Sequence, residues 1–189
     1  MIARAIGAGL QAALQLARGR PEGLRLLDGT DDQRHVAVLS FWAAALTLPA
    51  LIALHLLSWK QGGIPTQAAR SFVLELITFV IGWAGFALVS HKMAVMLGRE
   101  KRWWRFITVW NWCNLVQYLM LVVASVPLLM ELPDWVGETT RLAAIGWALW
   151  LEWYATKLTL GLPTRGAVLF VAVDILIGLF LAGIEGSLG

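Results

Sequence analysis

Five polar side chains stand inside otherwise apolar stretches of the chain, and their types could do chemistry there. They are Asn111, Asn114, Gln117, Glu152 and Asp174. An ionisable group inside a membrane span is costly and is therefore a functional candidate. At 1.5 Å per residue, the five lie roughly 8–17 Å from one end of their helices, so we expect one intramembrane polar cluster. It could conduct protons or ions or bind a lipid headgroup; the alternative is interhelical hydrogen bonding.

A second pair of titratable residues is expected at the opposite membrane face. His55 lies near the far end of the first apolar stretch, and Glu75 lies about one turn into the second. On adjacent antiparallel helices these two side chains can pair. Thr78, Gly82 and Gly85 continue the Glu75 face, and small residues there allow a close helix approach.

Catalytic and metal-binding motifs are absent from the sequence. It contains no HExxH, no GxSxG and no phosphate-binding GxxxxGK[ST]. The single Cys113 lies in an apolar stretch, and the three histidines stand at different levels. We therefore predict no catalytic residue, no metal site and no cofactor, and the chain is not expected to be an enzyme.

Five apolar stretches must position these side chains. Of the 189 residues, 59% are hydrophobic and 14% are charged, which excludes an ordinary water-soluble globule. A hydrocarbon core of about 30 Å needs roughly 20 apolar residues in a helix. The windows that qualify are Val36–Ser58, Ser71–Leu97, Phe106–Met130, Thr139–Lys157 and Gly166–Ile184. We predict an all-α polytopic membrane protein: a cytoplasmic arm (residues 1–35) and a bundle of five transmembrane helices (residues 36–189).

The distribution of Lys and Arg predicts the orientation. Twelve of the fifteen basic residues fall in the N-terminal segment and in or beside the polar breaks Gly98–Arg105 and Leu158–Arg165 between the predicted spans, and three fall elsewhere. Cytoplasmic loops hold the excess, so the N-terminus is expected in the cytoplasm and the C-terminus outside. The Ala-, Arg- and Trp-rich composition suggests a bacterial gene, and hence the bacterial cytoplasmic (inner) membrane.

Basic and aromatic residues near the expected cytoplasmic face predict contacts with anionic lipid headgroups. They are Arg4, Arg18, Arg99, Lys101, Arg102, Trp103, Trp104 and Arg105. The net charge of +3 is too small to indicate nucleic acid as a partner. Membrane lipids are the expected partners, together with other membrane protein subunits or further copies of the chain.

The arm has the pattern of an amphipathic helix lying in the membrane interface. Its apolar residues fall within one arc of about 120° on a helical wheel, and its polar residues lie opposite. The apolar set is Ile2, Ile6, Leu10, Ala13, Leu14 and Ala17. The alternative is that this face packs under the helix bundle, and both can hold together.

The run "MLGREKRWWRF" followed by "ITVWNW" resembles an element of the Ypt-interacting-protein (YIP) family, in which a span ends in a Leu-Gly turn before a short polar loop with an aromatic residue. The resemblance covers about residues 36 to 185 and implies a cytoplasmic N-terminus with five spans. The chain is also similar to small bacterial membrane proteins with "IGW" in the second span. It departs from the family because no proline follows the aromatic in the third span. The acidic and aromatic N-terminal motifs of the eukaryotic members are not recognisable, so their GTPase binding is not transferred.

These features favour a non-enzymatic scaffold or accessory subunit that packs against lipid or a larger membrane complex. The alternative is a small transporter or a proton- or ion-conducting protein that uses the polar cluster of the third to fifth spans.

Overall fold

The computed structural model describes residues 2–27 and 32–188, with side chains for residues 5–27 and 32–187, and this part of the chain is all-helical. In chain order the elements are α1 (Ile2–Leu16), the 3-10 helix η1 (Pro21–Leu27), α2 (Gln33–Ser40), α3 (Trp42–Gly62), α4 (Ala68–Met96), α5 (Glu100–Ala124), α6 (Val126–Leu129), α7 (Asp134–Leu160) and α8 (Thr164–Leu188). The prediction of an all-α fold is confirmed.

Four helical stretches among the described residues are long and apolar enough to cross a membrane. They are Gln33–Gly62, Ala68–Met96, Glu100–Leu129 and Thr164–Ser187. The predicted fourth span lies within α7, which has 27 residues but carries Arg141 and Glu152 among many Trp and Thr residues. These residues lower its hydropathy, although α7 packs along both α5 and α8.

Glycine and proline set the short turns between the long helices. Gly98 follows α4 with φ 66°, and Gly161 follows α7 with φ 61°. Glycine reaches this left-handed conformation without a Cβ clash, and it commonly ends helices. Pro133 and Pro163 then stand directly before α7 and α8. Each turn is too short for anything but an antiparallel return of the chain.

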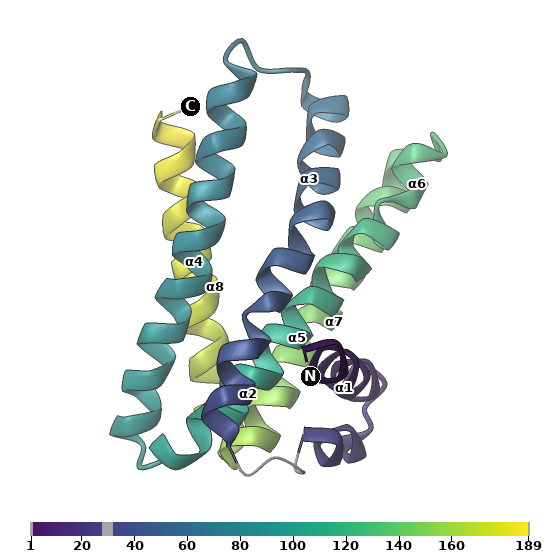
Figure 1. The fold of residues 1–189 in the computed structure, drawn as a ribbon. Helices are drawn as coiled ribbons and strands as arrows, with labels where there is room; N and C mark the ends of the chain where they lie inside the picture. The colour runs from purple at the N-terminus through teal and green to yellow at the C-terminus, as the bar shows by residue number, and fades with distance from the viewer. Residues whose placement is uncertain (1, 28–31, 189) are drawn as a thin grey trace.

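The long helices separate into two pairs along the bundle (Figure 1). α4 packs against α8, while α5 packs against α7 and α3. The pairs lie close together near the α4–α5 and α7–α8 turns, which we call the inner end. They diverge toward the α3–α4 connection and the C-terminus, which we call the outer end, with α3 between them (Figure 1).

The tightest part of the core lies near the inner end. Phe86, Phe106 and Phe170, one each from α4, α5 and α8, are at most 1% exposed. The Phe106 ring centroid lies 6.2 Å from that of Phe86 and 5.5 Å from that of Phe170. These three rings form a dry aromatic layer across the bundle.

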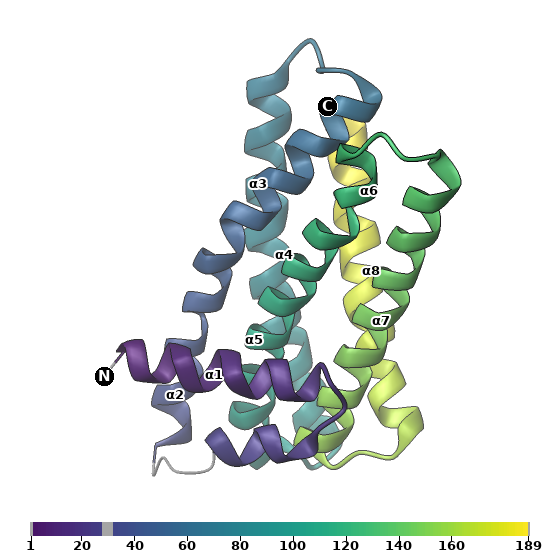
Figure 2. The same cartoon turned by 90° about the vertical axis from the view of Figure 1, so that its right-hand side faces the viewer.

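The arm lies across the bundle near the inner end, with α1 roughly perpendicular to the long helices (Figure 2). Its buried face consists of Gly9, Ala12, Ala13 and Leu16, which pack toward α5. On a helical wheel this face is turned by about 90° from the centre of the predicted apolar arc. Leu14 is consequently 38% exposed. The small residues of α1 pack against the bundle, and its larger apolar residues lie beside this contact.

Candidate functional site in the membrane domain

Asn111 on α5 joins three helices at the inner end. Its Oδ1 accepts a hydrogen bond from Nε1 of Trp83 on α4 at 2.7 Å, and its Nδ2 donates to Oγ of Ser40 on α2 at 2.7 Å. The side chain is completely buried. The amide oxygen and the amide nitrogen are therefore both hydrogen-bonded within the protein, and Asn111 links α5 to α2 and α4.

The other two amides of the predicted cluster have different surroundings. Nε2 of Gln117 donates to the backbone oxygen of Ala148 on α7 at 2.8 Å. Nδ2 of Asn114 donates to the backbone oxygen of Trp110, one turn earlier on its own helix, at 3.0 Å. Gln117 thus ties α5 to α7, whereas Asn114 bonds within its own helix and lines a cavity.

Glu152 and Asp174 lie next to each other where α7 meets α8. Glu152 is 5% exposed, and Trp110 on α5 is its other polar neighbour. Among the described residues, Oε1 of Glu152 and Nε1 of Trp110 have no hydrogen-bond partner of normal geometry. Two carboxyl groups therefore lie side by side where α7 meets α8, and that of Glu152 is buried.

A cavity of about 310 Å³ opens between α4, α5 and α8, with Leu51 of α3 in its wall. Three acids line it: Glu75, Asp174 and Glu185. Of the described residues that line it, none is Lys or Arg. The cavity is therefore suited to a positively charged guest rather than an anion.

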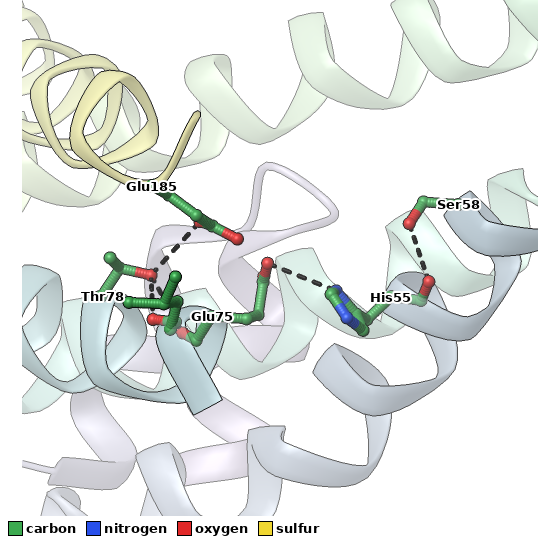
Figure 3. A network of polar contacts seen from close by, with 6 residues as sticks. His55, Ser58, Glu75, Thr78 and Glu185 are labelled. Carbon is green, nitrogen blue, oxygen red and sulfur yellow. Dashed lines mark hydrogen bonds and ion pairs between the residues drawn. The ribbon is translucent and has the colours of Figure 1, made fainter. Parts of the chain in front are cut away.

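The outer end of the cavity carries a polar network (Figure 3). Nδ1 of His55 on α3 lies 3.4 Å from Oε2 of Glu75 on α4, so the structure places the predicted outer pair in contact. Oγ1 of Thr78 donates to Oε2 of Glu185 on α8 at 3.5 Å. Figure 3 shows the carboxyl groups of Glu75 and Glu185 pointing toward the same space. α4 and α8 thus supply two acids at the outer end of the cavity, and α3 supplies the histidine that pairs with Glu75.

The inner end of the cavity is closed. Trp83 and Trp110 line it there, and the Phe86 ring stacks on Trp110 at 4.5 Å between centroids. Phe86 and Phe170 lie one helical turn nearer the inner end than Trp83 and Asp174, so the aromatic layer separates the cavity from that face. The cavity is a blind pocket that begins at the outer half of the bundle.

The structure separates the residues expected to contact headgroups. Arg18, Lys101 and Arg102 are exposed near the inner end, and Arg102 also donates to the backbone oxygen of Leu160 at 3.3 Å. Trp103 is instead 8% exposed and donates to Oγ of Ser90 at 3.1 Å, so its ring packs within the bundle. The remaining residues, Arg99, Trp104 and Arg105, are half-buried, and the side chain of Arg4 lies outside the described residues.

Two titratable residues of the cavity wall are not predicted from the sequence, Glu185 and Tyr118. Glu185 follows directly after the predicted end of the fifth span, so hydropathy does not mark it as a membrane residue. Its spacing from Asp174 is the signal that could have found it, because 11 residues are close to three full helical turns and place both acids on one face. Across the described residues, no group of three or more His, Cys, Asp or Glu is arranged to hold a metal ion.

The comparisons with curated proteins and with solved structures find no match. A family model described as the Yip1 domain matches residues 24–184, from η1 into α8. Proteins of this family are non-enzymatic membrane trafficking proteins that interact with other membrane proteins, so the expectation of a non-enzymatic protein is confirmed. The match confirms the resemblance seen in the sequence, and the chain belongs to the Yip1 domain family of multi-pass integral membrane proteins.

Proposed function

We propose that this protein is a non-enzymatic scaffold or accessory subunit of the bacterial cytoplasmic membrane. The observation that carries the proposal is how the buried amides are used. Asn111 and Gln117 both spend their hydrogen bonds on other helices of the same chain. These bonds tie α5 to α2, α4 and α7 and hold the bundle together as a frame.

Five crossings fit this architecture better than four. α7 has 27 residues, about 40 Å of helix, and it runs between α5 and α8 through the thickness of the bundle. The C-terminal end of α8 lies at the outer end of the bundle, opposite the arm (Figure 1). The twelve Lys and Arg that favour the cytoplasm gather at the arm and the two inner turns. We therefore place the inner end in the cytoplasm and the C-terminus outside.

Within this plan, residues 1–35 act as a cytoplasmic arm and residues 36–189 as the membrane domain. The hydroxyl of Tyr154 on α7 donates to the backbone oxygen of Gly19 at 3.0 Å, which fastens the end of α1 to the bundle. The half-buried Ile6 and Leu10 and the exposed Leu14 can enter the lipid interface beside that contact. Exposed Arg18, just after the end of α1, suits anionic headgroups.

Contact with further membrane protein subunits, or with another copy of the chain, would use the outer surfaces of α4 and α8. Val80 and Leu88 on α4 are 60% and 69% exposed, and Leu179 and Phe180 on α8 are 64% and 68% exposed. In a bilayer such surfaces meet either lipid or another apolar helix.

A test is isolation of the tagged chain in a mild detergent, followed by native mass spectrometry. The proposal expects defined protein companions or a defined homo-oligomer. The double variant Leu88→Trp, Leu179→Trp should reduce the fraction of the chain found in that complex. Leu142→Trp on α7 is the matched control, because Leu142 is 66% exposed on a different helix. A strictly monomeric chain in native membranes, cross-linked before solubilisation, would contradict the scaffold role.

The second candidate function is proton or ion conduction, and the acids of the cavity favour it. Conduction would need the aromatic layer of Phe86, Phe106 and Phe170 to open, because it closes the pocket from the inner face. Reconstituted vesicles with a pH-sensitive dye separate the two functions. The scaffold predicts a flux equal to that of empty vesicles. A flux that is present in the parent and lost in both Asp174→Asn and Glu152→Gln would favour conduction.

A further inference from the structure

The membrane cavity carries carboxyl groups at both of its ends. Asp174 and Glu185 line it from the same face of α8, and 11 residues separate them by about 16 Å along the helix axis. Glu75 joins Glu185 at the outer end, and Glu152 lies behind Asp174 at the inner end. A single small cation cannot touch both ends at once.

The walls between these two ends are apolar and aromatic. Phe79, Tyr118, Ile177 and Leu181 line the middle of the cavity. A Cβ added at Gly178, also in the wall, would meet nothing within 4 Å, which shows open space there. The faces of aromatic rings attract organic cations as well as alkyl chains. The lining thus alternates from acidic to apolar to acidic along its length.

Beside the inner end of the cavity, one buried acceptor lacks a partner. Oε1 of Glu152, which is 5% exposed beside Asp174, has no hydrogen-bond partner among the described residues. Two adjacent carboxylates repel each other, and an ammonium group beside them would offset that repulsion while donating several hydrogen bonds.

We propose that the cavity binds a linear diamine or polyamine. One ammonium group lies at the inner end beside Asp174, the alkyl chain lies against the aromatic walls, and the other ammonium group lies between Glu75 and Glu185. The volume of about 310 Å³ falls within the usual range for small-molecule sites, which is roughly 300–1,000 Å³. A metal ion or the single amine of a lipid headgroup would satisfy one end only.

The test uses the full chain in detergent micelles, with binding measured by calorimetry and by the shift of the thermal unfolding midpoint. Putrescine, spermidine and spermine form a length series, and butylamine is the matched monoamine. We expect spermidine or spermine to bind at least about tenfold more tightly than butylamine, because only a ligand charged at both ends gains both sets of hydrogen bonds. Phosphatidylethanolamine and Mg²⁺ should not displace the bound polyamine.

Variants locate the site. Asp174→Asn and Glu185→Gln should each weaken spermidine binding by about tenfold or more, since each removes one charged contact. Glu131→Gln is the control, because Glu131 is an exposed acid at the outer end that pairs with Lys60 and does not line the cavity.

Equal affinity for spermidine and butylamine would overturn the proposal, as would equal loss of binding in all three variants. Displacement of the polyamine by phosphatidylethanolamine or Mg²⁺ would overturn it too. The length series needs only the parent protein, so the proposal remains testable if a variant fails to fold.

Discussion

Replacing Asn111 with Ala should be among the most damaging changes in the membrane domain. The substitution removes two interhelical hydrogen bonds of 2.7 Å, to Trp83 and to Ser40. Interhelical hydrogen bonds in membranes contribute about 0.6–2 kcal/mol each. The indole N–H of Trp83 is also left buried without an acceptor, at a further cost of about 1–3 kcal/mol. Because these contributions overlap, we expect the free energy of unfolding to fall by about 2–4 kcal/mol.

Asn114→Ala is the matched control, one turn further along the same helix. Its Nδ2 bonds only to the backbone oxygen of Trp110, and the side chain borders a cavity, so the expected loss is below about 1 kcal/mol. Reversible unfolding in mixed micelles, followed by tryptophan fluorescence, measures both variants. A double-mutant cycle with Trp83→Phe should return a coupling of about 1 kcal/mol. Equal losses for the two Asn variants would refute the role of Asn111 as the joint between helices.

The remaining predictions concern topology, arm docking and one turn. A reporter inserted after Gly98 should be active in the cytoplasm and one fused to the C-terminus outside it; cytoplasmic activity of both would refute five spans. Gly9→Val should release α1 and increase its proteolysis, because a side chain there meets the ring of Trp112, whereas Gly7→Val, with open space, should not; equal cleavage would contradict docking. Gly161→Ala should lower the free energy of unfolding by about 1–2 kcal/mol, because φ is 61° there, and an unchanged midpoint in thermal unfolding would count against that strain.

Hydropathy was sufficient to predict most of the fold. Long apolar runs can only be helices in lipid, since every backbone group must be bonded within the segment. The predicted fourth span, Thr139–Lys157, lies within α7, which packs against α5 and α8 but is not among the four helical stretches that are long and apolar enough to cross a membrane. The length of α7 and its contacts with α5 and α8 are the basis on which a fifth crossing is proposed.

The sequence predicted how deep each residue of the candidate site lies along its helix, but not which neighbouring helix its side chain faces. The rise per residue places Glu152 and Asp174 at similar levels, and the structure brings them together. Rotation about each helix axis depends on packing, which no single sequence reveals. Asn111 and Asn114 belong to the same predicted polar cluster, yet Asn111 joins α5 to α2 and α4 while Asn114 lines the cavity.

The polar side chains near the two ends of the bundle have different surroundings. Near the inner end, amides bind other helices and three phenylalanines exclude water, so that region tolerates little change. Toward the outer end, α4 and α8 diverge from α5, and Glu75 and Glu185 line a cavity. Isosteric changes at Glu185 should therefore alter ligand binding with little effect on assembly, whereas changes at Asn111 should weaken the fold and everything that depends on it. The proposed scaffold role and the proposed polyamine site can therefore be refuted independently of each other.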